Sequence, residues 1–202
     1  MAVNLQKGQK ISLEKEAGSA LTQVKMGLGW DVASTGKSGG GFLSGLFGGG
    51  GGGNDSIDLD ASVVMFNDQK QPIDVVYFGQ LQSKDGTILH SGDNRTGAGD
   101  GDDEVITVNL SSIPANVQAL VFTVNSFTGQ SFEKVANAYC RILNGANGSE
   151  IARYNLSAQG IHTAMIMAKL YRHNGEWKMH AIGETANGRT FNDLMPAILP
   201  HV

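Results

Sequence analysis

The residues best suited to do chemistry lie in one acidic, glycine-rich stretch, residues 92–104. Its formal charge of −4 equals that of the whole 202-residue chain. Crowded carboxylates repel one another unless a cation neutralises them, and glycines let the backbone fold back without steric penalty. Calcium binds about 6–8 oxygens from carboxylates, amides, carbonyls and water. The stretch therefore has the chemistry of a hard-cation site, with carboxylates at Asp93, Asp100, Asp102, Asp103 and Glu104.

Three other interpretations of this stretch compete with a metal site. An EF-hand would place Glu104 at position twelve counted from Asp93, but Arg95 and Gly97 stand where that loop needs oxygen side chains, and Ala98 replaces its turn glycine. A phosphate-binding glycine loop is excluded because the carboxylates would repel the anion. A solvated acidic turn stays open on this stretch alone.

Short segments of alternating or continuous apolar residues must position the acidic stretch. Such patterns are typical of strands, and turn residues at roughly 8–12-residue spacing favour an all-β fold, an antiparallel two-sheet β-sandwich. A short C-terminal helix is predicted to follow a capping box at Thr190, and Asn174-Gly175 is predicted to form a hairpin turn. The nearly all-apolar run at residues 117–124 predicts a central strand buried on both faces. Asp31, Asp58 and Asp60 lie near the ends of predicted strands. We therefore expect them at the same end of the sandwich as the acidic stretch, and this end is called the rim. The predicted strands cover residues 10–15, 21–28, 57–66, 73–78, 105–110, 117–124, 138–143, 150–156, 163–171 and 177–182.

The length and composition predict a single domain, residues 1–202, interrupted by a flexible glycine-rich insertion at residues 34–56. The insertion contains one apolar hexamer, Phe42-Leu43-Ser44-Gly45-Leu46-Phe47. Two interpretations stay open for it. The insertion is either a surface loop that packs its own apolar residues against the domain, or a tethered docking element for a partner, a membrane surface or another copy.

Several classes of protein are disfavoured by composition. The slight negative charge and the lack of a Lys/Arg cluster argue against nucleic-acid binding. Cys140 is the sole cysteine and lies in a strand-like run, which indicates a buried, inert thiol in a reducing compartment. No export signal or membrane span is visible, so a cytoplasmic location is expected. The five histidines have no zinc-site spacing, His90 is expected to be structural or solvated, and no catalytic constellation accompanies the carboxylates.

Three separated motifs resemble the signature of the tellurium-resistance TerD family: Gly27–Asp31, Asp58–Ser62 and Gly92–Glu104. Residues 122–127 and the insertion look closer to the TerZ branch of that family. The resemblance implies a calcium-binding β-sandwich of bacterial stress operons, linked to resistance to tellurite, phage and pore-forming colicins. By motif match, the implied metal ligands are Asp31, Asp58, Asp60, Asp93, Asn94, Asp102, Asp103 and Glu104.

The preferred functional hypothesis is a non-enzymatic calcium-binding module that acts through other stress-operon proteins, including proteins at the membrane. The alternative is a calcium-dependent enzyme or a receptor for a small ligand such as a nucleotide or sugar. Seven carboxylates around one divalent ion would leave about five uncompensated negative charges. We therefore expect two calcium ions that share bridging carboxylates, with magnesium competing poorly.

Overall fold

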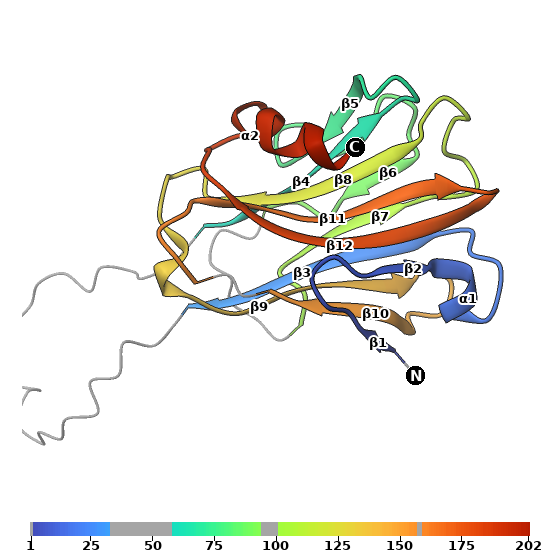
Figure 1. The fold of residues 1–202 in the computed structure, drawn as a ribbon, viewed down its shortest axis with the longest axis horizontal. Coiled ribbons are helices and arrows are strands. Elements are labelled where there is room, and N and C mark those ends of the chain that lie inside the picture. The colour runs from blue at the N-terminus through green and yellow to red at the C-terminus, as the bar shows by residue number, and fades with distance from the viewer. Residues whose placement is uncertain (1, 33–57, 94–100, 157–158) are drawn as a thin grey trace, which may run out of the picture.

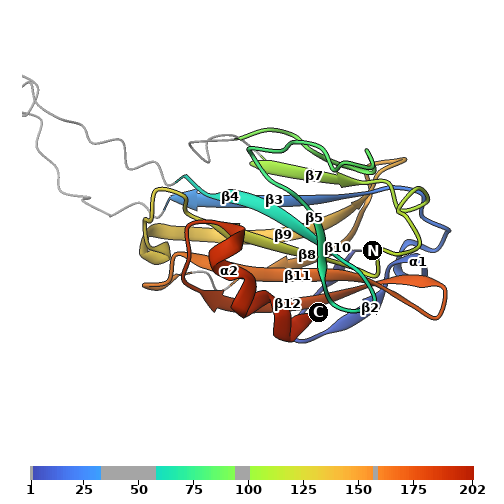
Figure 2. The same ribbon diagram turned by 90° about the horizontal axis from the view of Figure 1, so that it is seen from above.

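The computed structural model describes residues 2–32, 58–93, 101–156 and 159–202. Their strands form two six-stranded sheets that face each other (Figures 1 and 2). Sheet A has the order β1(Val3–Asn4), β10(Glu150–Asn155), β9(Val135–Asn144), β3(Val24–Val32), β7(Glu104–Val108), β6(Ile88–His90). Sheet B has the order β2(Lys10–Ser12), β12(Glu176–Ala186), β11(Ala164–His173), β8(Ala119–Asn125), β4(Asp60–Phe66), β5(Pro72–Val76).

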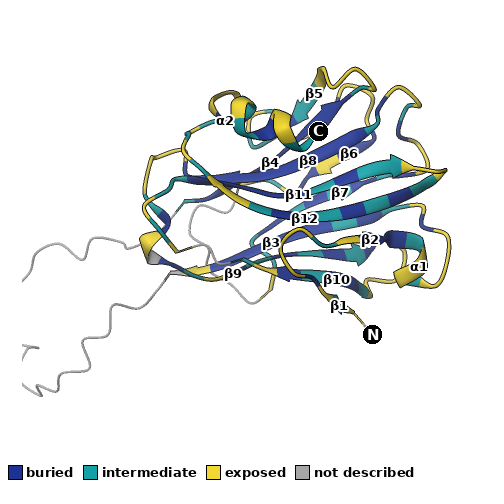
Figure 3. Cartoon of the chain, viewed as in Figure 1, coloured by how far each residue is buried: buried dark blue, intermediate teal, exposed yellow. Residues whose placement is uncertain are grey.

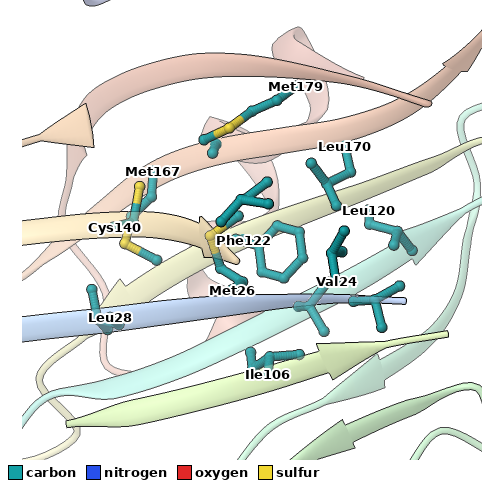
Figure 4. Packing of buried hydrophobic residues seen from close by; sticks show 14 of the residues in the cluster. Val24, Met26, Leu28, Ile106, Leu120, Phe122, Cys140, Met167, Leu170 and Met179 are labelled. Atoms are coloured by element: carbon teal, nitrogen blue, oxygen red, sulfur yellow. The ribbon is translucent and has the colours of Figure 1, made fainter. Parts of the chain in front are cut away.

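The predicted fold class is confirmed. Neighbouring strands pair antiparallel throughout the described sheets, apart from the short parallel contact of β1 with β10. The core lies between the sheets, where Met26 of β3 faces Phe122 of β8 and Met179 of β12 (Figure 4). Figure 3 shows that most strand residues are buried or intermediate, whereas the exposed residues gather in the loops and helices. The sandwich therefore gets its stability from two sheet faces removed from water.

Strand β8 is central and buried on both faces, as its continuous apolar run predicted. Its inward side chains Phe122 and Val124 join the core between the sheets, whereas Val121 faces outward. Helix α2(Phe191–Ile198) covers that outer face, with Leu194 and Ile198 buried against the sheet. An antiparallel sheet that would otherwise expose apolar side chains is thus covered on its second side.

Two local predictions near the C-terminus are confirmed. The Thr190 hydroxyl accepts a hydrogen bond from the Asp193 amide, and the Asp193 carboxylate accepts one from the Thr190 amide, so the capping box fixes the start of α2. Asn174 and Gly175 both have positive φ, 53° and 81°, and join β11 to β12 in a tight hairpin. The short helix η2(Leu199–His201) ends the chain.

One predicted strand is partly wrong. Residues 10–15 alternate apolar and polar, but β2 ends at Ser12 and helix α1(Leu13–Ala17) follows. The Ser12 side chain accepts a hydrogen bond from the Lys15 amide, and Gly18 closes the helix at φ 67°. A cap residue and a C-terminal glycine stabilise one helical turn here, and this local capping outweighs a short period-two pattern.

Other predicted strands shift at their ends. Strand β4 begins at Asp60 rather than at residue 57, β3 runs on to Val32, and β8 starts two residues later than expected. The short helix η1(Phe132–Lys134), which the pattern does not indicate, leads into β9. The predicted insertion at residues 34–56 lies outside the described residues. Neither α-helix of the described chain has the length or apolar content needed to cross a lipid bilayer.

Candidate metal centre

Four strand ends meet at one end of the sandwich and carry the candidate site. In sheet A, Glu104 begins β7 opposite Leu28 of β3. In sheet B, Asp60 begins β4 opposite Asn125 at the end of β8. Figure 1 shows β3 ending and β4 beginning at the same end of the molecule. The acidic side chains therefore come to one rim, as expected from their places at strand ends.

Glu104 joins the two sheets at this rim. Its side chain is fully buried, and its Oε2 accepts a 2.6 Å hydrogen bond from the Ala61 amide of β4. His90 of β6 lies beside it, with Nε2 3.4 Å from Glu104 Oε2 and 3.2 Å from the Ala61 carbonyl. The Gly92 amide donates to His90 Nδ1 over 3.0 Å, so the neutral ring carries its proton on Nε2 and donates toward these oxygens. His90 thus has a structural place in the site.

The first group of carboxylates consists of Asp58, Asp60 and Asp93. Each offers an oxygen, and these oxygens all lie within 4.8 Å of one another. Asp60 is 3% exposed, and within the described part of the chain its Oδ2 is buried without a hydrogen-bond partner. Burial, followed by the charges of Asp58, Glu104 and Asp93, raises the Asp60 pKa from 3.8 to about 7. A hydrogen bond from the Phe127 backbone amide lowers the Asp60 pKa and so opposes that rise.

The second group consists of Asp31 and Asp103. Asp103 Oδ2 accepts the Trp30 amide at 2.8 Å, and its own amide donates to the Leu28 carbonyl at 2.7 Å, which extends the β3–β7 pairing into the loop. Burial raises the Asp103 pKa against that Trp30 hydrogen bond, with the charges of Asp31, Glu104 and Asp102 adding to the rise. Glu104 is therefore the carboxylate whose charge acts on both groups.

Asp31 is held in place by a neighbour that sequence reasoning missed. Asn137 Nδ2 donates to Asp31 Oδ2 at 2.8 Å. Asn137 adopts a left-handed φ of 50°, a conformation that non-glycine residues visit with strain and Asn tolerates best. Sequence reasoning had no signal for this contact, because 106 positions separate the two residues.

Asp102 is bound to a cation and a phenol of sheet A. Its Oδ1 accepts Arg141 Nε at 2.8 Å and lies 3.1 Å from the Tyr139 hydroxyl. Arg141 also pairs with Glu150 at 3.1 Å. The carboxylate that was predicted as a ligand therefore fastens the acidic stretch to β9, through partners that sequence reasoning missed.

The glycine spacing in the first motif has a steric cause. A Cβ on Gly27 would lie 2.1 Å from Asp102 Oδ2, and a Cβ on Gly29 would lie 2.5 Å from the Tyr139 ring. Both glycines face the side chains that hold the end of the acidic stretch. Alternate glycines on β3 thus leave the room that Asp102 and Tyr139 occupy. The remaining predicted ligand, Asn94, lies outside the described residues.

The comparisons with known proteins agree with the architecture. The sequence pattern that defines the TerD domain matches residues 1–196. The chain is 50% identical to "Tellurium resistance protein TerZ" of Serratia marcescens, over 99% of this chain and 98% of that protein. It is 42% identical to "Stress response protein SCP2" of Bacillus subtilis, over 96% and 98% of the two chains.

Two solved structures have a similar fold. A Streptomyces coelicolor homologue of the telluride resistance protein TerD superposes with a TM-score of 0.63 at 21% identity, over 84% of this chain and 92% of that one. A protein described as of unknown function gives a TM-score of 0.66 at 24% identity, over 87% and 96%. At these identities the likeness establishes the fold alone.

The raised pKa of Asp60 predicts a pH dependence in protein freed of divalent ions. The folded pKa of about 7 exceeds the ordinary 3.8, so the neutral acid stabilises the fold at low pH and this stability is lost as pH rises through 7. The loss amounts to a few kcal/mol, because a one-unit pKa difference corresponds to about 1.4 kcal/mol. We expect Asp60→Asn, which cannot ionise, to gain stability over the original protein between pH 4 and pH 7.

The measurement is urea unfolding at several pH values, read as the difference between variant and original. Taking the difference cancels the opposite trend of Asp74, Asp85 and Glu150, whose pKa values are lowered. Asp68→Asn, in an exposed turn, is the control and should give a flat difference. A flat difference for Asp60→Asn as well would show that Asp60 is not buried among like charges.

Gly27→Ala should detach Asp102 from Arg141 and lower stability by about 1–3 kcal/mol, the range for overpacking a buried position. The cause would be the 2.1 Å approach of the added Cβ to the Asp102 carboxylate. In an Asp102→Ala background the same change should cost much less, because the clashing group is gone. Additive costs in this double-mutant cycle, measured by urea unfolding, would contradict the steric explanation.

Proposed function

We propose, from the premise that this chain belongs to the TerD family, that its acidic rim binds Ca²⁺ and that the protein is a non-enzymatic module of a stress-response system. The names of its relatives connect the family with tellurium resistance and with the stress response. Those names do not mention calcium, so calcium binding at the rim is our own proposal.

The observation that carries the calcium proposal is the state of Asp60. Its buried Oδ2 has no hydrogen-bond partner within the described residues, and it shares a 4.8 Å cluster with the carboxylates of Asp58 and Asp93. A buried, unsatisfied carboxylate among like charges costs free energy that a bound cation removes. An all-oxygen set suits a hard cation such as Ca²⁺ better than the softer metals that prefer nitrogen or sulfur.

Two ions are proposed rather than one. The carboxylates fall into two groups, one of Asp58, Asp60 and Asp93 and one of Asp31 and Asp103, and the Glu104 charge acts on both. Six carboxylates around a single divalent ion leave roughly four uncompensated charges, whereas two ions leave about two. When bound, the ions would supply the positive charge that lets these side chains stay ionised together.

We further propose that the module acts through partner proteins of the same stress system, in the cytoplasm, and contributes to resistance against phage and pore-forming colicins. Asp31 and Asp93 are exposed at the rim, so a change in calcium occupancy would alter a surface that a partner can contact. The partners would be other proteins of the stress operon, some at the membrane, with no role for nucleic acid.

A second candidate function, a calcium-dependent receptor for a small ligand, is favoured by one observation. A polar pocket of about 690 Å³ lies against Asp31, with Asn137, Tyr139 and Arg153 in its walls. The guanidinium of Arg153 stacks 4.1 Å from the Tyr139 ring centroid, which presents planar polar groups suited to a sugar or nucleotide. A ligand-binding ion would keep exchangeable waters, and luminescence lifetimes of a bound lanthanide would count them.

Isothermal titration of chelator-stripped protein should show two equivalents of Ca²⁺ and little heat from Mg²⁺, which gives up its waters reluctantly. Asp60→Asn should remove one equivalent of Ca²⁺, because it takes a carboxylate from the first group. Asp103→Asn should remove the other, because it takes a carboxylate from the second group. Binding should also raise the thermal midpoint, since a hundredfold excess over Kd stabilises by about 2.7 kcal/mol. Asp68→Asn is the matched control and should bind as the original does. A stoichiometry of one would refute the two-ion proposal, and no binding would refute both.

Tellurite resistance should depend on the rim. In a bacterium carrying the complete stress operon, Asp60→Asn should reduce survival on tellurite to the level of the deleted protein, because one of the two proposed calcium sites is lost. Circular dichroism should show that the variant is folded, and Asp68→Asn should retain resistance. Full resistance of a folded Asp60→Asn protein that has lost its calcium equivalent would show that this calcium site is not needed for resistance.

A further inference from the structure

Two neighbouring hollows lie on the outer side of sheet B, beside helix α2, and are together called the groove. Its first part, about 330 Å³, is walled by aromatic residues, including Phe78 and Phe127. Its second part, about 300 Å³, is lined by apolar residues of β5 and α2, such as Val75 and Met195. Phe191 and Asn192 line both parts, so the two hollows adjoin each other between α2 and the chain that follows β5.

Four aromatic rings run in series along this groove. The ring centroids of Phe127 and Phe78 are 5.4 Å apart, those of Phe78 and Tyr77 5.3 Å, and those of Tyr77 and Phe191 5.3 Å. Phe127 at the end of the row is 48% exposed. An apolar row that leaves a large aromatic side chain in water is typical of a surface that another apolar segment covers.

The groove also offers polar atoms suited to a peptide. Ser62 and Asn125, both nearly buried, lie in the wall of its aromatic part, and the Asn125 side chain donates to the Arg189 carbonyl at 2.8 Å. Arg189 holds the turn that bears Phe127 through hydrogen bonds to the carbonyls of Phe127 and Thr128. Peptide segments carry amides for such polar atoms and side chains for the apolar ones.

The chain re-enters the described structure next to this groove. The Asp58 amide donates to Gln130 Oε1 at 3.4 Å, and the Gln130 amide donates to Ser126 Oγ at 3.0 Å, within the turn that carries Phe127. Ten residues, 48–57, separate Asp58 from the apolar hexamer at residues 42–47. Glycine-rich chains of that length have an average span of about 16–19 Å, and they extend to about 33–36 Å. The hexamer is thus tethered within reach of the groove.

We propose that the hexamer Phe42–Phe47 of the same chain occupies the groove beside α2. Phe42, Leu43, Leu46 and Phe47 would cover the aromatic row, which removes apolar surface of both partners from water. The tether favours the chain's own segment over a free peptide, because linkage raises the effective concentration to about the millimolar range. Of the two sequence interpretations of the insertion, the proposal selects packing against its own domain. It does not depend on calcium.

Disulfide trapping tests the proposal in the full-length protein. Ser44→Cys places a thiol in the hexamer without removing an apolar side chain, and Asn192→Cys places the second on the exposed rim of the groove. Native Cys140 can stay, because it is buried and its pKa is raised to about 12. The intrachain disulfide should form at least about tenfold faster than in a control pair, as expected for a docked segment.

The control pair is Ser44→Cys with Ile161→Cys. Ile161 is 83% exposed and lies at the same end of the sandwich, since the neighbouring His162 carbonyl accepts the Phe132 amide, but it is not part of the groove. A second control replaces Phe42, Leu43, Leu46 and Phe47 with alanine in the Asn192→Cys pair. This change should slow trapping to the rate of the Ile161→Cys pair, because reach is kept and apolar contact is lost.

Gel electrophoresis without reductant separates the outcomes. Fast trapping within one chain that needs the four apolar side chains supports the proposal. Equal rates for the Asn192→Cys and Ile161→Cys pairs, or no effect of the alanine replacements, would overturn it. Predominant disulfide-linked dimers, with a rate that rises with protein concentration, would also overturn it and assign the groove to a second copy.

Discussion

The crowding of carboxylates at one end of the sandwich is the constraint on which the rest of the site depends. Glu104 is buried at the centre of that crowd, and its hydrogen bond to the Ala61 amide ties sheet A to sheet B where the two sheets meet the acidic stretch. The position of the carboxylate is therefore fixed by backbone geometry. Its charge acts on Asp60 on one side and on Asp103 on the other, so the fold itself imposes the repulsion.

Two means of relieving this repulsion are visible among the described residues. Asp102 is neutralised by protein, since Arg141 donates to it directly and Glu150 holds Arg141 in turn. The negative charge of Asp103 is stabilised by the hydrogen bond that its Oδ2 accepts from the Trp30 amide. Asp60 receives only a backbone amide against burial and three neighbouring charges. The unequal relief divides the acidic rim into Asp102, which anchors the stretch to β9, and a cluster around Asp60 whose charge an external cation would relieve.

The local features of the fold could be predicted from the sequence, because each depends on neighbours along the chain. The alternation of Val105 to Leu110, the Asn174-Gly175 turn and the capping box at Thr190 all carry their cause within a few residues. The prediction of a strand at residues 10–15 was partly wrong for an equally local reason, since the Ser12 cap and Gly18 stabilise a helical turn there. In a short segment, the hydrophobic pattern alone does not show whether a strand or a capped helical turn is more stable.

The finer arrangement of the site could not be predicted, because it depends on contacts between distant segments. Nothing near Asp102 indicates that Arg141 will pair with it, and nothing near Asp31 indicates Asn137. The three acidic motifs gave the composition of the rim, yet the grouping of their side chains follows from strand register across both sheets. The alternate glycines on β3 indicated a close approach by another group, but only the structure identifies one such group as the Tyr139 ring.

The place of the single cysteine limits how this chain can contribute to tellurium resistance. A direct reaction with a tellurium oxyanion at sulfur would need an accessible thiolate. Cys140 is fully buried in the core between Leu28 and Met167 (Figure 4), and burial raises its pKa to about 12, so the thiolate is nearly absent at neutral pH. Since the sequence holds no second cysteine, thiol chemistry on this chain is not available. Asp60 of the acidic rim carries a buried carboxylate oxygen without a hydrogen-bond partner among the described residues, so under the proposed function a contribution to resistance is best sought in what the rim would bind.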